Sequence, residues 1–339
     1  MQEKHQHNTL ILLSLKTPTE LCRFFKTSMP QLEEFINNPV YEHFVIRKKR
    51  GGERHIFAPE KELKKIQKRL NYFFQARYLG VKPPEVHGFV INPHYLGSYC
   101  NIVANAEPHT GKKHVLNIDL KDFFPSISAK QIKKLFTSSF FNYNEQIATA
   151  LALLTTYEAK LPTGAPTSPV LSNFVCHNMD AELYFFCRFN GLEFTRYADD
   201  LTFSSDIFIS KDVIQNIIQI IKNNGFEINE KKLRLQSSYR RQTVTGLTVN
   251  EKVNVNRNLL KKIRAMIHDL NTNGIDAATQ RHFKIVCTDV ARNAQYNHRK
   301  HFIYCLEGYI NFVGQVRGKE DVVYKKLKTS FLEFFANAR

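Results

Sequence analysis

Two adjacent carboxylates, Asp199 and Asp200, end a Tyr-Ala-Asp-Asp run at residues 197–200. Strand-like sequence flanks this run at residues 192–196 and 201–205, so we expect the run to form the tip of a β-hairpin. Two like charges at such a tip repel one another unless something compensates them. A bound divalent cation supplies that compensation, which makes the pair a candidate metal site.

A third candidate ligand, Asp119, ends the strand-like segment 115–118. A carboxylate at a strand end and two more at a hairpin tip form an arrangement that holds two metal ions for phosphoryl transfer. Mg²⁺ prefers oxygen ligands and keeps part of its water. We therefore predict that Asp119, Asp199 and Asp200 bind two Mg²⁺ ions, with Mn²⁺ as the candidate substitute and the Leu120 backbone carbonyl as a further ligand. The alternative is a set of surface acids in turns.

The composition points to a polyanionic partner. The chain has 339 residues, which suits one multi-lobed enzyme or two small domains, and 43% of them are hydrophobic. Its 48 Lys and Arg residues outnumber its 31 Asp and Glu residues, which gives a net charge of +17. This charge favours nucleic acid first and an anionic membrane second, with simple solubility as the alternative.

The sequence carries no sign of a membrane or of an oxidising compartment. No apolar run is long enough to cross a bilayer, and the apolar stretch at residues 10–13 is too short for a signal peptide. The six cysteines are scattered without a Cys-x-x-Cys pair, which favours reduced thiols over disulfides or a zinc site. We therefore expect a cytoplasmic protein without membrane contact.

The hydrophobic pattern predicts a mixed α and β protein. A run of strand, helix, strand, strand, helix and strand predicts a split βαβ sheet. Asp122 follows the first of these strands, and we expect it to cap the next helix. The expected elements are short helices over 9–39, a hairpin over 44–57 with basic arms around Gly51 and Gly52, a Lys-rich helix after Pro59, helices over 129–156, a loop at 161–169, a helix with Ser168 as its N-cap and Pro169 at its first position, a helix at 211–223, strands at 226–235 and 243–250, and helices over 256–339.

Five segments resemble, in order and spacing, the motifs of reverse transcriptases. Three are general to that family, namely residues 117–127, residues 161–169 and the Tyr-Ala-Asp-Asp run. Two others are similar to boxes of bacterial retron reverse transcriptases, Asn-Ala-x-x-His at residues 105–109 and Val-Thr-Gly at residues 244–246. The resemblance covers roughly residues 40–330 of the chain.

This resemblance implies an α+β right-hand polymerase with fingers, a palm built on a split βαβ antiparallel sheet, and a helical thumb. The implied activity is that of an RNA-directed DNA polymerase, a nucleotidyltransferase. The implied divisions are an N-terminal helical segment at 1–39, fingers at 40–114 that return at about 128–165, a palm at 115–250, and an RNA-binding thumb at 251–339.

The resemblance also implies roles for side chains around the carboxylates. Phe124 is the candidate steric gate against a 2′-hydroxyl, with Phe123 as its competitor and a core aromatic as the alternative. Arg54 and Lys48 on the hairpin are candidates to hold the triphosphate, and surface charges are the alternative. Lys232 is the candidate catalytic acid that protonates the leaving pyrophosphate, and a solvated charge is the alternative.

Other motif residues are implied to contact nucleotide or RNA. Thr163 stands where the family commonly has Gln, whose amide can contact the incoming nucleotide, and Gly164 lets the backbone approach the base pair. Asn105 and His109 are implied to engage the cognate RNA, with a turn cap and a buried core histidine as the respective alternatives. The box implied to grip the primer end consists of Val244, Thr245 and Gly246.

A retron enzyme implies partners beyond its dNTP substrates. It binds one structured noncoding RNA as template and primer, and it starts DNA from an internal 2′-hydroxyl of a guanosine. The implied product is RNA-linked single-stranded DNA, called msDNA, and a host RNase H activity removes the template. The family works in bacterial anti-phage defence, commonly with a separate effector or toxin protein.

Two other hypotheses stay open. The first is another bacterial reverse transcriptase, of the group II intron, diversity-generating or abortive-infection type, and the two retron boxes weigh against the last two types. The second is an RNA-binding scaffold that restrains a toxin, and the intact set of three carboxylates weighs against a purely structural role. Loss of catalysis without loss of biological function would favour the scaffold.

Overall fold

The computed structural model describes residues 2–48, 51–91, 100–283 and 298–337. The chain divides into two compact units, Met1–Ser237 and Ser238–Arg339, here called the N-terminal and C-terminal units. Each unit is described by itself.

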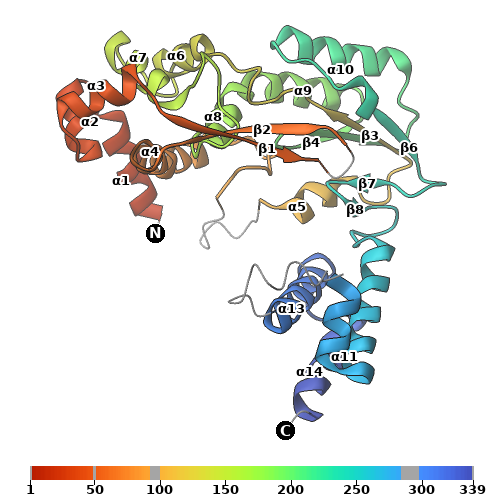
Figure 1. Ribbon diagram of the computed structural model, residues 1–339. Coiled ribbons are helices and arrows are strands. Elements are labelled where there is room, and N and C mark those ends of the chain that lie inside the picture. The colour runs from red at the N-terminus through yellow and green to blue at the C-terminus, as the bar shows by residue number, and fades with distance from the viewer. Residues whose placement is uncertain (1, 49–50, 92–99, 284–297, 338–339) are drawn as a thin grey trace. The chain divides into compact units, whose positions relative to one another are not determined.

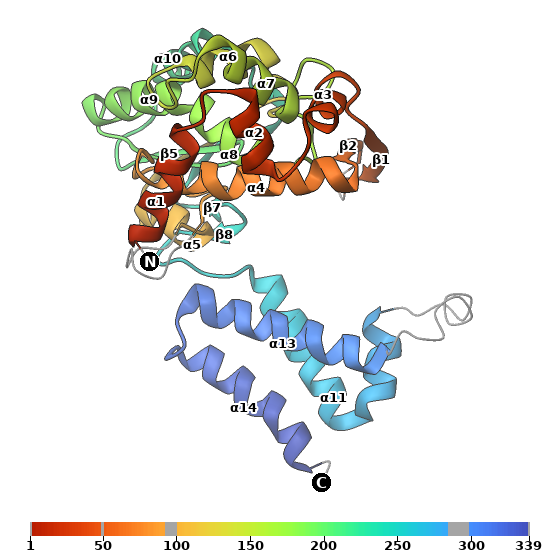
Figure 2. The same cartoon turned by 90° about the vertical axis from the view of Figure 1, so that its left-hand side faces the viewer.

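Short helices open the N-terminal unit, as the sequence predicts. Both α2 (Pro18–Phe25) and α3 (Met29–Asn37) begin with a capping box, in which the N-cap hydroxyl and a side chain one turn later satisfy each other's backbone N–H groups. The first helix, α1 (Gln2–Leu13), begins before the predicted residue 9 and packs against the long helix α4 (Lys61–Leu79) (Figure 2).

The predicted hairpin is present as β1 (Tyr41–Arg47) paired antiparallel with β2 (Glu53–Pro59). Part of its predicted turn, residues 49–50, lies outside the described residues. The edge of β2 that does not pair with β1 contacts the predicted loop at residues 161–169, because the Phe57 N–H donates to the Thr163 carbonyl over 2.7 Å. A Cβ on Gly164 would lie 2.9 Å from the Phe57 carbonyl oxygen, so only glycine lets the loop lie this close to β2.

The main sheet of the N-terminal unit is four-stranded and antiparallel (Figure 1), and the three predicted metal ligands lie at the ends of its strands. Its strand order is β4-β5-β3-β6, formed by β4 (Glu193–Tyr197), β5 (Asp200–Ser205), β3 (His114–Asp119) and β6 (Arg234–Ser237). This is the split βαβ order that the sequence predicts. The hydrophobic core that includes this sheet also contains buried residues of α6 (Ala129–Thr137), α7 (Glu145–Thr155), α8 (Ser168–Val175), α9 (His177–Phe189) and α10 (Lys211–Asn223).

The predicted strand at 226–235 is wrong over most of its length. Ile228 forms only an isolated bridge with Leu120, and a 3₁₀ turn, η3 (Glu230–Lys232), precedes β6. The run of polar residues after Ile228 closes a local turn, in which the Lys232 N–H donates to the Asn229 carbonyl over 2.8 Å. The chain therefore reaches the sheet edge only at Arg234.

Two cap predictions are also wrong. The N-cap of α8 is Thr167, because the Ser168 hydroxyl instead donates to the Pro162 carbonyl over 2.7 Å. Asp122 does not cap α6, since Ser128 fills that position in a capping box with Gln131. Asp122 is exposed in a turn with φ 45°.

The predicted strand at 243–250 is instead a small hairpin in the C-terminal unit. Strand β7 (Thr243–Val244) pairs with β8 (Leu247–Thr248). The two intervening residues, Thr245 and Gly246, have φ values of 46° and 84°, which is the backbone of a two-residue hairpin turn.

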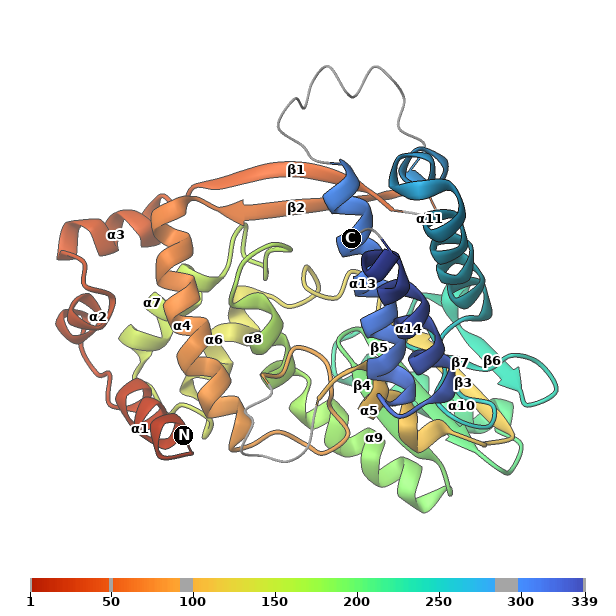
Figure 3. The ribbon, with the colours of Figure 1, turned by 90° about the horizontal axis from the view of Figure 1, so that it is seen from below.

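In the described part of the C-terminal unit, helices follow this hairpin and confirm the helical prediction, whereas residues 284–297 lie outside the described residues. These helices are α11 (Arg257–Phe283), α13 (His298–Arg317) and α14 (Val322–Asn337), which pack against one another (Figure 3). Gly314 on α13 lies against the Tyr324 ring, where a Cβ would come within 2.6 Å. Within the described part of the chain, no helix has the length and apolar character needed to cross a membrane.

Candidate active site

The three predicted carboxylates meet at one end of the sheet. Tyr197 pairs with Asp200, so Ala198 and Asp199 form a two-residue hairpin turn, as the sequence predicts. Asp200 lies opposite Asp119 in the register of β5 against β3. The Leu120 N–H donates to the Asp199 carbonyl over 3.0 Å and ties the end of β3 to the turn.

The side-chain pKa values of Asp199 and Asp200 are both raised above their ordinary range. Burial raises the pKa of Asp199, and repulsion from Asp119 adds to the effect. The pKa of Asp200 is raised to about 6 by loss of solvent, then by the charges of Asp199 and Asp119. Asp200 still keeps exposed surface, so solvent screens part of this repulsion. A cation bound at this end of the sheet would relieve it.

The donors suit a hard cation, but they are not gathered as a preformed cage. All three side chains supply oxygen, the ligand type that Mg²⁺ prefers. Among the described residues, no group of three or more His, Cys, Asp or Glu side chains is close enough to be a metal site as it stands. Asp119 is instead paired with Lys232, whose ammonium lies 2.8 and 2.9 Å from its two carboxylate oxygens.

A buried ion pair that the motif reasoning missed supports the acidic turn. Arg196 Nε and Nη2 donate to the two oxygens of Asp180 over 2.6 and 2.7 Å, and neither residue has exposed surface. Burial opposes the charge of Arg196, but the Asp180 carboxylate outweighs it and raises the pKa of the guanidinium. Arg196 Nη1 also donates to the Ala198 carbonyl over 3.1 Å, so the charged pair holds the turn itself.

The same network extends to a glycine that touches the turn. Arg196 Nη1 donates to the Asn173 side-chain oxygen over 3.0 Å, and Asn173 Nδ2 donates to the Gly88 carbonyl over 3.0 Å. A Cβ on Gly88 would lie 2.3 Å from the Ala198 nitrogen. The only sequence signal for this network is an arginine inside an otherwise inward-facing strand, which calls for a buried acidic partner.

The two predicted triphosphate ligands, Arg54 and Lys48, differ in their relation to the carboxylates. The positive charge of Arg54 on β2 lowers the pKa of Asp199, after larger effects from burial, Asp119 and Lys232, so Arg54 acts on the carboxylate end of the sheet. Lys48 follows β1 at an exposed position, and the described residues give it no ion pair with the carboxylates. Arg54 is thus the better placed of the two.

The two candidate gate residues differ in burial. Phe123 is only 6% exposed, belongs to the core and packs beside Phe226, with ring centroids 5.9 Å apart. Phe124 is half-buried and lies between Phe123 and Phe89, at centroid distances of 5.4 and 5.7 Å. Because Phe123 fills the core, we retain only Phe124 as the candidate gate.

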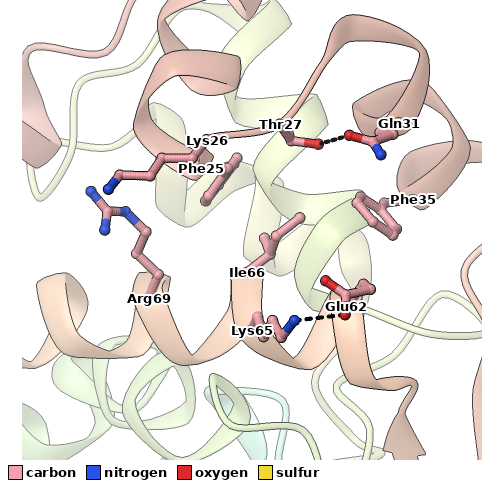
Figure 4. A pocket seen from close by; sticks show the side chains of 9 residues that line it. All are labelled: Phe25, Lys26, Thr27, Gln31, Phe35, Glu62, Lys65, Ile66 and Arg69. Atoms are coloured by element: carbon pink, nitrogen blue, oxygen red, sulfur yellow. Dashed lines mark hydrogen bonds and ion pairs between the residues drawn. The ribbon is translucent and has the colours of Figure 1, made fainter.

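A cavity of about 460 Å³ lies apart from the predicted site, between α2, α3 and α4 (Figure 4). Arg69 at its edge stacks over the Phe24 ring at 4.8 Å, and Lys65 pairs with Glu62 over 2.7 Å. None of the predicted site residues lines this cavity.

A family comparison agrees with this arrangement. The model of the family described as reverse transcriptase (RNA-dependent DNA polymerase) matches residues 46–250, which include all three carboxylates. The chain belongs to the reverse transcriptase family. Family membership gives the chain the reverse transcriptase polymerase fold, in accord with its mixed helices and antiparallel sheet.

Curated relatives confirm the resemblance to retron enzymes. The chain is 34% identical to the retron Mx65 reverse transcriptase of Myxococcus xanthus, over 67% of this chain and 55% of that protein. It is 40% identical to the retron Ec86 reverse transcriptase of Escherichia coli, over 50% of this chain and 53% of that protein. The chain therefore spans about half the length of these retron reverse transcriptases.

A solved structure gives a looser match. The telomerase of Candida albicans in complex with a fragment of telomeric RNA aligns with 89% of this chain and 64% of its own, at 11% identity and a TM-score of 0.47. This similarity is too low to support a conclusion about the chain.

One retron-type box of the chain lies inside the fold. Asn105 and His109 have no exposed surface, so neither side chain can contact RNA in this conformation. The Thr195 hydroxyl donates to the Asn105 carbonyl over 3.1 Å and therefore accepts from His109 Nε2 at 2.8 Å. His109 Nδ1 then accepts from the Ser204 hydroxyl at 2.7 Å. His109 thus joins η2 (Glu107–His109) to the sheet. It is a buried core histidine, the alternative to an RNA contact in the sequence analysis.

The histidine of this box is neutral. Burial lowers the pKa of His109 to about 3, and the charges of His87 and Lys112 add to the effect. A neutral ring has one donor and one acceptor, which matches its two hydroxyl partners. We therefore do not retain the predicted RNA contacts of Asn105 and His109.

The Val-Thr-Gly box forms the tip of the β7–β8 hairpin. Val244 is fully buried, so its side chain cannot contact a primer in this conformation. Thr245 and Gly246 make the turn, and Gly246 is exposed. Of this box, only the turn residues remain candidates for contact with nucleic acid.

Proposed function

We propose that this chain is a retron-type, RNA-directed DNA polymerase. The single observation that carries the proposal is the meeting of Asp119, Asp199 and Asp200 at one end of the antiparallel sheet of a reverse transcriptase domain. The retron relatives support the type of enzyme. We assign the palm to the four-stranded sheet, the fingers to the β1–β2 hairpin with the helices before the sheet, and an RNA-binding thumb to the C-terminal helices.

The carboxylates and one backbone carbonyl form the proposed metal-binding set. Two Mg²⁺ ions bound there would supply activation of the primer hydroxyl and neutralisation of charge on the triphosphate. The Leu120 N–H points to Asp199, and in an extended residue the carbonyl points to the same side as the N–H, so Leu120 can offer its oxygen to the same site.

Other side chains act on the nucleotide. Arg54 offers a planar fork of donors to phosphate oxygens and lies where its charge reaches Asp199. Phe124 sets the floor under the sugar and excludes a 2′-hydroxyl. Thr163 and Gly164 hold the loop against β2 and line the path of the incoming base. Lys232, once free of Asp119, is the candidate acid for the leaving pyrophosphate.

The retron assignment adds an RNA partner and a particular product. The enzyme binds one structured noncoding RNA, which serves as template and primer, and extends DNA from an internal 2′-hydroxyl. The product is RNA-linked single-stranded DNA, made in the bacterial cytoplasm, with template removal by a host RNase H. Lys261, Lys262 and Arg264 on α11 are exposed cations that suit RNA phosphates. An effector protein and a role in anti-phage defence complete the proposal.

Primer extension on an RNA template tests the polymerase part. The purified chain with Mg²⁺ and dNTPs should extend a DNA primer, and Asp199→Asn should reduce synthesis by at least about 100-fold, because a metal-binding group is lost. Asp122→Asn is the matched control, since Asp122 is an exposed acid close to Asp119 in sequence and keeps its turn as asparagine. Equal activity of Asp199→Asn and Asp122→Asn would contradict the proposal.

A further inference from the structure

Lys232 is paired with Asp119, one of the predicted metal ligands, at the place where a metal cation is expected. The Lys232 ammonium approaches both oxygens of Asp119, and the Lys232 side chain is 57% exposed whereas that of Asp119 is 13% exposed. Its neighbour Lys231 is exposed and has no ion pair among the described residues. The pairing is thus specific to one of two adjacent lysines.

The backbone fixes Lys232 at this place. The Asn229 N–H donates to the Asp119 carbonyl over 2.7 Å, and the Lys232 N–H donates to the Asn229 carbonyl over 2.8 Å. The Lys121 N–H donates to the Glu227 carbonyl over 2.8 Å, on the other side of Leu120. These bonds join the end of β3 to η3, so Lys232 needs little additional ordering to reach Asp119.

We propose that Lys232 is a placeholder cation, which occupies the Asp119 carboxylate in the metal-free protein and must leave it when a divalent metal binds. This inference rests on the proposed function, because it takes Asp119 to be a metal ligand. Both Asp119 oxygens bond to the ammonium, so a metal and Lys232 compete for the same lone pairs. Lys232 is released as the metal is bound, and it becomes available to the triphosphate only in the loaded enzyme.

The ion pair between Lys232 and Asp119 has two properties that suit a placeholder. Three carboxylates at one end of a sheet repel one another, and a cation from the chain itself lowers that repulsion. The pair is partly exposed, so its attraction is modest and a metal can displace it. A deeply buried pair would hold the lysine too tightly for such an exchange.

Metal affinity without nucleotide tests the exchange. Free Mn²⁺ is measured by electron paramagnetic resonance during titration of the wild type, Lys232→Met, Lys231→Met and Asp119→Asn. Lys232→Met removes the competing ammonium, so this variant should bind Mn²⁺ about two- to fivefold more tightly than the wild type. This is the change in affinity that corresponds to the free energy of a partly exposed ion pair. Lys231→Met removes one positive charge from the adjacent residue but leaves the ion pair between Lys232 and Asp119 intact. Its Mn²⁺ affinity should therefore equal that of the wild type.

A double variant separates competition from general charge effects. In an Asp119→Asn background the ion pair no longer exists, so adding Lys232→Met should leave the remaining Mn²⁺ affinity within about twofold. Unchanged or weaker Mn²⁺ binding by Lys232→Met overturns the inference, as does an equal gain in Lys231→Met.

The same titrations distinguish this inference from the proposed function. If Asp119→Asn weakens Mn²⁺ binding while Lys232→Met has no effect, the placeholder role fails and the metal site stands. If the wild type binds no Mn²⁺ that depends on Asp119, both proposals fail.

Discussion

Arg196 and Asp180 form a doubly hydrogen-bonded ion pair with no exposed surface, and the same guanidinium donates to the Ala198 carbonyl of the acidic turn. Arg196 directly precedes the Tyr-Ala-Asp-Asp run, whereas Asp180 comes from α9. The pair therefore connects the helical layer to the position of Asp199, although neither residue belongs to the proposed metal-binding set.

Breaking this pair should cost both stability and activity. Asp180→Asn leaves a buried guanidinium without its counter-charge and should lower the free energy of unfolding by about 3–5 kcal/mol. Urea denaturation measures this loss. Asp122→Asn, an exposed acid, should change stability by less than about 0.5 kcal/mol. A loss below 1 kcal/mol for Asp180→Asn would contradict the structural role of the pair.

Replacing both partners separates stability from positioning. The double variant Asp180→Leu with Arg196→Met removes both buried charges, so it should be more stable than either single variant. It also removes the donor to the Ala198 carbonyl, so primer extension should stay low. Full recovery of synthesis in the double variant would show that Arg196 does not position the turn.

Gly88 should be intolerant of even one methyl group. A Cβ there would lie 2.3 Å from the Ala198 nitrogen, so Gly88→Ala should push the turn away and reduce synthesis about 100-fold. Gly80→Ala is the matched control, because its nearest contact would be an ordinary 3.5 Å. Primer-extension rates of the two folded variants provide the comparison, and equal rates would contradict the close packing of Gly88 on the turn.

His109 should affect how the stability of the protein depends on pH, and it should not affect RNA affinity. Its folded pKa of about 3 lies below the ordinary 6.5, so the unfolded chain binds more protons between these values. The wild type should therefore lose stability as the pH falls from 6.5 towards 3, by up to about 1.4 kcal/mol per pH unit from this group. His109→Gln should weaken that dependence and cost roughly 1–3 kcal/mol at pH 7.

The control for this prediction is His7→Gln, at an exposed position on α1, which should leave the pH dependence unchanged. Filter binding to the cognate RNA, well below the unfolding temperature, should give His109→Gln the affinity of the wild type. Weak RNA binding by a fully stable His109→Gln would restore His109 as an RNA contact.

Phe124 and Phe123 should respond differently to truncation. Phe124→Ala should raise incorporation of ribonucleotides while template-directed synthesis continues, because the half-buried ring is the proposed floor under the sugar. Phe123→Ala empties a core position and should cost about 3–5 kcal/mol of stability without a change in sugar selectivity. Competition assays with paired dNTPs and ribonucleotides measure selectivity, and the gate assignment fails if Phe124→Ala keeps the wild-type preference.

The sequence was sufficient where the signal is local. The hairpin around Asp199, the strand ending at Asp119 and the helix Lys211–Asn223 follow from hydrophobic periodicity and turn residues close in the chain. The antiparallel sheet follows from the order of these elements. The motif positions then identified the family.

The rest depends on contacts between distant segments. The strand predicted at 226–235 fails because Ile228 meets only Leu120 while the following polar residues turn back to bring Lys232 to Asp119. Arg196 alone does not indicate that Asp180 is its partner, because α9 packs beside β4 only in the folded chain. Burial of His109 likewise follows from two hydroxyls on β4 and β5, which no local pattern identifies.

The most direct test of the account is to express the chain with its neighbouring noncoding RNA and to look for RNA-linked single-stranded DNA, beside an Asp199→Ala, Asp200→Ala variant. The account predicts a DNA band that ribonuclease shifts and that the variant lacks. If no such band forms while the purified protein extends a primer on unrelated RNA, the chain is a reverse transcriptase of another type and the retron assignment is contradicted. If neither activity appears, the RNA-binding scaffold becomes the better account.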